Sequence, residues 1–158
     1  MTIGFESISR TCPRFATGRS RSPRLSFVED YGHAESLPPG ECRQLLADSS
    51  VGRVCWPTPE GIQVLPVVYR FDGTVIVFRT SQGTRLAELL NPTAVAFQVD
   101  DLDMGTRVGW TVLVQGVTGP TSEDHDLAVP AAWVPGDRSL SIQITPHSCN
   151  GRAVAAAD

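Results

Sequence analysis

Short runs of alternating apolar residues, each followed by a turn-forming residue, constrain the fold of this chain more than any other feature. Val51–Trp56 precedes Pro57, and Ile62–Tyr69 is separated from Val75–Thr80 by the pair Asp72-Gly73. A period of two over roughly four to eight residues is typical of half-buried β-strands, and Asp-Gly between two such runs predicts a hairpin. The pattern therefore predicts a mainly β fold, with the strand at Val51 ending at Pro57.

Three further segments carry the strand pattern later in the chain. They are residues 93–100, 110–119 and 140–145. Residues 41–47 have the apolar spacing of a helix and follow a predicted turn at Pro38–Gly40. Residues 84–90 have the same spacing, and Asn91-Pro92 ends this second helix. About six mostly antiparallel strands with short helices indicate a closed or partly closed barrel, because closure removes exposed strand edges.

Residues 1–36 differ in composition from the rest of the chain. They contain mainly Arg, Ser, Gly, Pro and Thr, with few apolar residues and no sustained period. Such a segment cannot offset the entropy cost of ordering. We therefore expect a disordered extension over most of residues 1–36, one folded domain over residues 37–152 and a flexible tail over residues 153–158.

The basic residues exclude several classes of enzyme, because all 13 are arginine. A Schiff-base lysine, a lysine-anchored pyridoxal phosphate site and a Walker A phosphate loop all require the missing amine. Five of the arginines lie within residues 1–25, so the remaining chain is strongly acidic and repels a nucleic-acid backbone. We therefore expect no nucleic-acid partner.

The sequence also predicts the cellular compartment of the protein and the oxidation state of its cysteines. No apolar run reaches the roughly 18 residues of a membrane helix, and the first residues lack the apolar core of a secretory signal. We expect a cytoplasmic protein with no membrane partner. Cys12, Cys42, Cys55 and Cys149 lack zinc-ligand spacing, so we expect free thiols. The alternative is one disulfide in a secreted protein.

Acidic residues gather at Glu123–Asp126, where carboxylates and a histidine could bind a cation. This segment follows Gly119-Pro120 in a predicted loop, and hard cations need ligands that converge from a defined loop geometry. We therefore interpret it as solvated surface and expect no metal site.

Phosphate-binding chemistry is concentrated in residues 79–85, where a predicted strand meets a predicted helix. The candidate groups are Arg79, Thr80, Ser81, Thr84 and Arg85. A helix N-terminus has free N–H groups and a positive dipole end, and a guanidinium can bind two phosphate oxygens at once. These residues form a candidate phosphate cradle. A helix cap flanked by solvated arginines is an equally compatible interpretation.

Eight short motifs follow one another in a fixed order along the chain. They are Val51–Val54, Val64–Val67, Val77–Thr80, Gly83–Ala87, Ala96–Asp100, Gly109–Gly116, Trp133–Gly136 and Gly151-Arg152. Together they resemble the pyridoxamine 5′-phosphate oxidase-like flavin-binding split-barrel family, over about residues 38–152. The resemblance is greatest to small actinobacterial-type members related to nitroimidazole reductases. It implies a homodimer of split β-barrels with FMN in clefts between the subunits.

The resemblance also implies which residues bind the cofactor. They are Leu65, Pro66 and Val67 along the isoalloxazine ring, Arg79, Thr80, Ser81, Thr84 and Arg85 around the phosphate, Trp110 and Thr111 at the ring edge, and Trp133 near the last strand. The chain has Leu86 where pyridoxamine phosphate oxidases proper carry a second basic residue, and it lacks their C-terminal Arg-x-His motif. We therefore do not expect pyridoxal phosphate synthesis.

The expected function is FMN-dependent oxidation or reduction of a small molecule. A flavin carries the redox chemistry itself, so the sequence need not contain a general acid or base, and we assign no catalytic residue. Two alternatives remain open. One is a deazaflavin-dependent reductase on the same fold, and the other is a non-catalytic module that carries flavin or haem.

Overall fold

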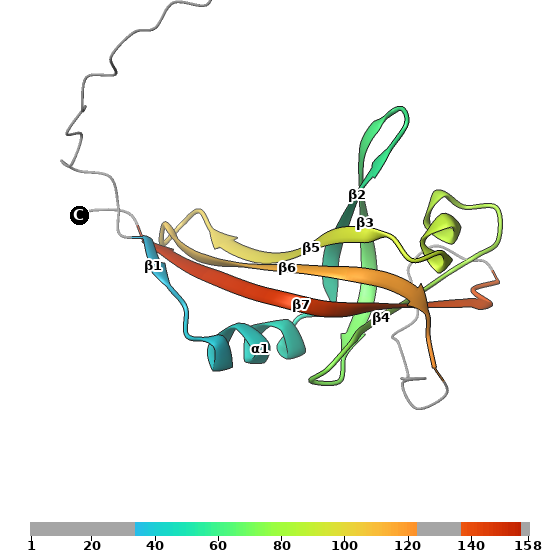
Figure 1. Ribbon diagram of the computed structural model, residues 1–158. Coiled ribbons are helices and arrows are strands. Elements are labelled where there is room, and N and C mark those ends of the chain that lie inside the picture. Colours follow the sequence, from blue (N-terminus) through green and yellow to red (C-terminus); the bar gives the residue numbers. More distant parts are fainter. Residues whose placement is uncertain (1–33, 123–136, 156–158) are drawn as a thin grey trace, which may run out of the picture.

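The computed structural model describes residues 34–122 and 137–155. Within them, one antiparallel sheet of seven strands is accompanied by an α-helix and a short 3₁₀-helix (Figure 1). The elements are β1 (Ala34–Ser36), α1 (Pro39–Asp48), β2 (Val51–Thr58), β3 (Gly61–Phe71), β4 (Ile76–Thr80), η1 (Arg85–Leu90), β5 (Ala94–Asp103), β6 (Val108–Pro120) and β7 (Leu140–Ala155). The predicted mainly β fold is confirmed.

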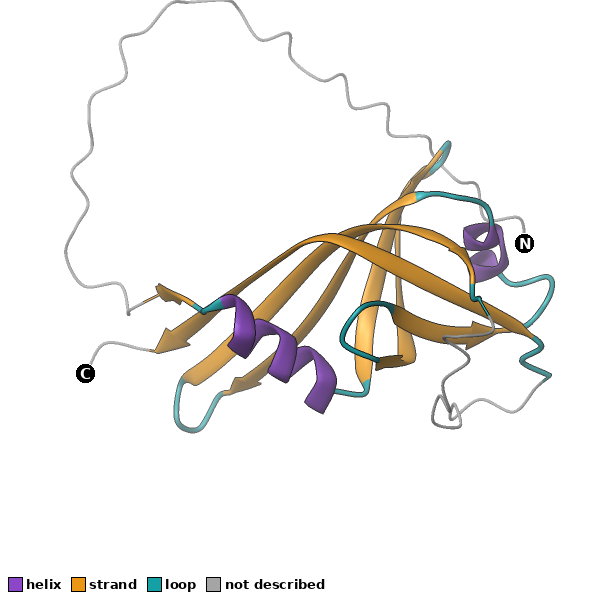
Figure 2. Ribbon diagram, turned by 60° about the horizontal axis from the view of Figure 1, so that its bottom comes forward, coloured by secondary structure: helices purple, strands orange, loops and turns teal. Residues whose placement is uncertain are grey.

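The sheet closes on itself through its longest strand, β7 (Figure 2). The strand order is β1-β7-β4-β3-β2-β5-β6, and β6 pairs in turn with β7. The first part of β7 pairs with β4, from Leu140 opposite Thr80 to Ile144 opposite Ile76, whereas its last part pairs with β1. Strands β2 to β7 thus form a ring of six, and β1 is an added edge strand.

The β3–β4 connection is the turn that Asp72-Gly73 predicts. Oδ1 of Asp72 accepts hydrogen bonds from the backbone N–H groups of Thr74 and Val75, each with an N–O distance of 2.7 Å. Gly73 has a φ of +97°, a conformation that glycine adopts at little cost because it has no Cβ. The local turn chemistry therefore fixes this hairpin.

Inward-facing side chains of the barrel form one apolar core. The buried rings of Tyr69 and Phe97 meet edge to face, with centroids 4.9 Å apart. Gly52 leaves room for Phe97, since a Cβ at this position would lie 2.2 Å from ring carbon Cζ. The Tyr69 hydroxyl donates a hydrogen bond of 2.6 Å to the carbonyl oxygen of Leu46 in α1. The core thus connects the barrel to its helix.

Two prolines behave differently from the sequence prediction. β2 does not end at Pro57 but continues to Thr58. Because β5 pairs with β2 only over residues 53–55, Pro57 lies on an edge where its missing N–H breaks no ladder bond. Pro39, predicted in a turn, is the first residue of α1, a position where no intrahelical N–H bond is formed.

Strands also extend into segments that we predict to be irregular. β1 occupies the last three residues of the predicted N-terminal extension, and β7 continues through Ala155, into the predicted C-terminal tail. Backbone pairing holds both segments together, with Ala34 opposite Val154. The expectations for residues 1–33, Glu123–Asp126, Trp133 and residues 156–158 lie outside the described residues.

The described cysteines, Cys42, Cys55 and Cys149, are free thiols. None of the helices in residues 34–122 and 137–155 has the length and hydrophobicity needed to cross a lipid bilayer.

Candidate functional site

The candidate phosphate cradle lies where β4 leads into η1, at one end of the barrel (Figure 1). Thr80 is 1% exposed, and its Oγ1 lies 2.8 Å from Oγ1 of Thr84. The Thr84 hydroxyl donates to the carbonyl oxygen of Ser81 at 2.9 Å, so Thr80 is the donor to Thr84. The Ser81 hydroxyl donates to the carbonyl oxygen of Asp137. The structure therefore brings the three predicted hydroxyls into one loop, with each hydrogen directed at a protein acceptor.

Arg85 is the exposed cation of this loop. Its Nη1 lies 3.8 Å from Oε2 of Glu60, at the tip of the β2–β3 hairpin, and the two side chains are 57% and 62% exposed. Exposed ion pairs of this kind contribute only about 0–1 kcal/mol, so Glu60 does not prevent Arg85 from binding an anion. Arg79 points away from Thr80, because successive side chains of a strand alternate between faces. The structure therefore separates Arg79 from the hydroxyls.

The helix after the loop is shorter and tighter than predicted. η1 is a six-residue 3₁₀-helix, not an α-helix. The dipole of so short a helix is small, so the predicted anion binding at this loop would depend mainly on side chains. Trp56 anchors η1 to β2, since its Nε1–H donates a hydrogen bond of 2.6 Å to Oε1 of Glu88. Leu89, fully buried, fixes the other side of η1 in the core.

The three predicted ring-lining residues do not share one face of β3. Leu65 and Val67 point inward, where Val67 is 6% exposed and Leu65 packs against the core. Pro66 points outward and lies opposite Arg53 of β2. A ring placed against the outside of this strand would therefore contact Pro66 and the backbone.

Trp110 and Thr111 lie at the other end of the barrel from the cradle. Thr111 pairs with Arg152 of β7, whereas Thr80 pairs with Leu140. A dozen residues separate these two positions of β7, which corresponds to roughly 40 Å of strand at about 3.3 Å per residue. Figure 1 and Figure 2 both show η1 and the β5–β6 turn at opposite ends of the sheet. A single chain therefore does not bring the phosphate and ring-edge residues together.

The outward side of β2, β3, β5 and β6 is a largely apolar surface, which we call the outer face. It consists of Val51, Arg53, Cys55, Pro57, Ile62, Val64, Pro66, Ala94, Ala96, Gln98, Asp100, Thr111, Leu113, Gln115 and Val117. Ile62 is 75% exposed, Val64 52% and Val117 43%. Contiguous exposed apolar surface of this kind typically marks an interaction site.

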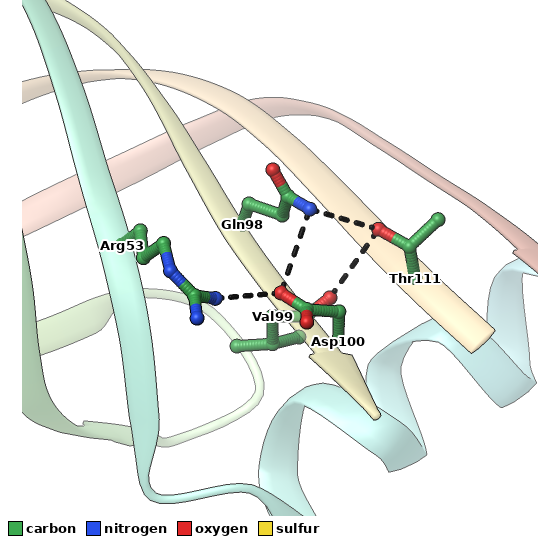
Figure 3. Close-up of polar contacts among 5 residues, drawn as sticks. All are labelled: Arg53, Gln98, Val99, Asp100 and Thr111. Carbon is green, nitrogen blue, oxygen red and sulfur yellow. Dashed lines mark hydrogen bonds and ion pairs between the residues drawn. The ribbon is translucent and has the colours of Figure 1, made fainter. Parts of the chain in front are cut away.

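Four polar side chains of the outer face form a hydrogen-bonded network (Figure 3). Arg53 Nη1 lies 2.7 Å from Oδ1 of Asp100, and Gln98 Nε2 donates to Oδ1 of Asp100 at 3.5 Å and to Oγ1 of Thr111 at 3.4 Å. The Thr111 hydroxyl donates to the carbonyl oxygen of Val99 at 3.5 Å. The network holds Thr111, a predicted site residue. Sequence analysis missed its other members, because Arg53 and Asp100 become neighbours only through the β2–β5 register.

A groove of about 500 Å³ opens on the outer face beside the β2–β3 hairpin. Its walls include Cys55, Ile62, Ala96 and His147. This volume is in the range of small-molecule sites, and the walls are mainly apolar. Burial raises the pKa of the Cys55 thiol, and the nearby Arg53 charge only partly opposes this. Cys55 is therefore a neutral thiol at physiological pH, which agrees with its role as a small apolar residue.

Residues 34–122 and 137–155 contain no group of three or more His, Cys, Asp or Glu side chains that could hold a metal ion.

Comparison with known families identifies the chain. Residues 38–153 match the sequence profile of the pyridoxamine 5′-phosphate oxidase family. The protein belongs to this family. The match extends from the start of α1 nearly to the end of β7, so the family fold includes the candidate cradle and the outer face. An uncharacterized protein of Mycobacterium tuberculosis is 24% identical to the chain over 146 residues, covering 87% of this chain and 96% of that protein.

Solved structures with this family's fold include two from Mycobacterium smegmatis. The FAD binding protein has a TM-score of 0.60 and 24% identity, with 77% of this chain and 98% of that chain covered. The FAD and heme binding protein has a TM-score of 0.61 and 12% identity, with 78% of this chain and 76% of that chain covered. These similarities confirm the predicted split-barrel fold.

Proposed function

We propose that this protein binds FMN and uses the bound flavin to oxidise or reduce a small molecule in the cytoplasm. The observation that carries the proposal is the loop between β4 and η1, where exposed Arg85 directly follows Thr84, whose hydroxyl contacts that of Thr80. Family membership supports it, and so does the FAD binding of a relative with the same fold. Flavin supplies hydride or single-electron transfer when bound, while the protein supplies orientation and shields the ring from water.

The residues present fit a flavin phosphate. Arg85 carries a side chain that is 57% exposed and paired with Glu60 at the long distance of 3.8 Å, so its guanidinium can turn toward two phosphate oxygens. The exposed Thr84 hydroxyl can rotate away from the Ser81 carbonyl and donate to an anion, while the buried Thr80 hydroxyl donates to Thr84 Oγ1. In this proposal Pro66 and the β3 backbone flank the ring, and Trp110 and Thr111 approach its edge.

A complete site requires two copies of the chain. The cradle and the pair Trp110-Thr111 are separated by roughly 40 Å of strand, well beyond the length of FMN. A two-fold axis through the outer face would place the far end of one copy beside the cradle of the other, in two equivalent sites. We therefore infer a homodimer in which each flavin contacts both protomers.

The outer face has the composition that such a dimer needs. Its apolar side chains include Ile62, Val64, Leu113 and Val117, each at least 40% exposed in the single chain. Burying this surface against a second copy would stabilise the dimer by a free energy of about 25 cal/mol for each Å² of apolar surface removed from water. The Arg53–Asp100 network supplies directional polar groups within the same surface, which favour one orientation of the partner.

Substitution of Arg85 tests the flavin assignment. Arg85→Ala removes a charge-assisted contact worth roughly 1.5–3 kcal/mol, so the dissociation constant for FMN rises about tenfold or more. Binding is measured by quenching of flavin fluorescence during titration. Arg70→Ala is the matched control, because Arg70 is an exposed arginine of β3 that lies outside the loop and pairs with Val77 of β4. An Arg85→Ala protein that binds FMN as tightly as the parent would contradict the proposal.

A second candidate is a cofactor-carrying module without turnover, or a reductase that uses deazaflavin. The observation that favours a carrier is the relative described as an FAD and heme binding protein. His147 on the wall of the outer-face groove is an exposed imidazole that could ligate haem iron. Parallel titrations with FMN, FAD, deazaflavin and haem distinguish these cofactors. A bound flavin that no nicotinamide nucleotide reduces would favour the carrier.

A further inference from the structure

Helix α1 and strand β7 each place one cysteine in the contact between them. Cys42 of α1 is fully buried, and its Sγ lies 2.7 Å from the point where a Cβ on Gly151 would stand. Cys149 lies two residues before Gly151 in β7 and on the same side of the strand, because the two residues pair with buried Val114 and Val112. Cys42 belongs to the core, and Cys149 packs against it. The two thiols therefore meet between helix and strand.

The surroundings make the two thiols unequal. Burial raises the pKa of Cys149, the adjacent Cys42 thiol raises it further, and the charge of Arg43 opposes both effects. A cavity of about 270 Å³ is lined by Cys149 together with Arg43 and His147. Cys42 is 0% exposed, and its S–H points to the carbonyl oxygen of Leu37 at 3.7 Å. A small solute can therefore reach Cys149 but not Cys42.

We propose that Cys149 and Cys42 form an oxidisable pair, in which hydrogen peroxide oxidises Cys149 and Cys42 converts the product into an intramolecular disulfide. The Cys149 thiolate attacks one peroxide oxygen, the O–O bond breaks, and a sulfenic acid and one water form. The Cys42 sulfur then displaces the sulfenic hydroxyl as a second water, and the S–S bond forms. Two electrons and both thiol hydrogens pass to the peroxide.

This reaction is independent of the flavin and has two physical consequences. Because the thiolate is the nucleophile and the pKa of Cys149 is raised, oxidation accelerates as the pH increases from neutral. The disulfide would join α1 to the second half of β7, which restricts the unfolded chain and raises the melting temperature.

The test uses the full chain with Cys12→Ser and Cys55→Ser, so that only the proposed pair remains. Peroxide treatment followed by peptide mapping is expected to find the Cys42–Cys149 cross-link, and dithiothreitol is expected to reverse it together with the gain in melting temperature. Adding Cys42→Ser stops the reaction at the sulfenic acid, which dimedone labels at Cys149. Adding Arg43→Gln slows oxidation several-fold. Each protein is first checked by its circular dichroism and melting curve.

Three results would overturn the proposal. The first is that both thiols of the folded parent survive a peroxide treatment that oxidises the same chain when it is unfolded in urea. The second is that, in variants that keep only one of the two cysteines, dimedone labels Cys42 and not Cys149. The third is that the cross-links join different molecules, which appear as dimers on a non-reducing gel.

Discussion

Gly52 and Phe97 show how closely the inner face of the barrel is packed at the level of one residue. A Cβ at Gly52 would lie 2.2 Å from Phe97 Cζ, and Phe97 is fully buried and cannot move aside freely. Gly52→Ala is therefore expected to lower the free energy of unfolding by about 1–3 kcal/mol through overpacking. Urea denaturation measures the change. Gly40→Ala is the control, because no atom lies within 4 Å of its added Cβ and stability should not fall.

The carboxyl group of Asp103 makes a contribution to stability that should depend on pH. Its Oδ1 accepts hydrogen bonds from the backbone N–H groups of Gly105, at 2.7 Å, and Thr106, at 3.2 Å, and these bonds lower the pKa of the carboxyl. A depressed folded-state pKa contributes stability above the unfolded pKa, and this stability is lost as pH falls through the folded pKa.

Asp103→Asn is accordingly expected to melt below the parent at neutral pH, with the two melting temperatures converging in acid. Asp101→Asn changes the charge of the same exposed turn region and is the control. Curves for Asp103→Asn and the parent that stay equally far apart at every pH would rule out this role of the charge.

At the residue scale, sequence analysis succeeded where partners are local. Thr80 and Thr84 lie four positions apart, and their hydroxyls are in contact, while the Ser81 carbonyl accepts from Thr84. Arg79 faces the opposite side of β4 from Thr80, because adjacent strand residues alternate between faces, and its predicted role in phosphate binding stays a prediction. The Arg53–Asp100 contact spans 47 positions and depends on strand register, which no local pattern specifies.

At the scale of elements, a buried hydrogen bond from Tyr69 links α1 to the barrel. The buried Tyr69 hydroxyl donates to the carbonyl oxygen of Leu46, and burial raises the pKa of Tyr69 well above its usual range, so the donor stays protonated. Tyr69→Phe leaves that carbonyl without this partner and should cost about 1–3 kcal/mol. Amide hydrogen exchange should then be faster in α1 than in β5. Unchanged stability and exchange would show that packing alone holds the helix.

The sequence predicts best those elements whose turns are formed by hydrogen bonds and backbone conformations of neighbouring residues. The Asp72-Gly73 hairpin is confirmed because its geometry depends on three neighbouring residues. The second half of β7 is different, since Pro146, His147 and Asn150 break the apolar alternation and backbone pairing with β6 holds the strand. An alternating apolar pattern therefore predicts strands that bury one face. It does not predict strands, such as the second half of β7, that are stabilised by backbone hydrogen bonds to a neighbouring strand.

At the scale of the whole molecule, the central claim is that one flavin site is built from two chains. The family and its split barrel could be recognised from motif order, and both are confirmed. The separation of the cradle from Trp110 could not be predicted, because it depends on how far β6 and β7 run together. That separation is the reason to infer a shared site.

Mixing two defective variants tests this claim most directly. Arg85→Ala should damage the phosphate end of a site and Trp110→Leu its ring end, so each homodimer should bind FMN weakly. If sites are shared, a mixed dimer contains one site with both defects and one with neither, and random exchange of protomers restores about one quarter of the sites. Shared sites therefore predict that the refolded mixture recovers tight FMN binding in a titration. A mixture that binds no better than its two components would contradict it.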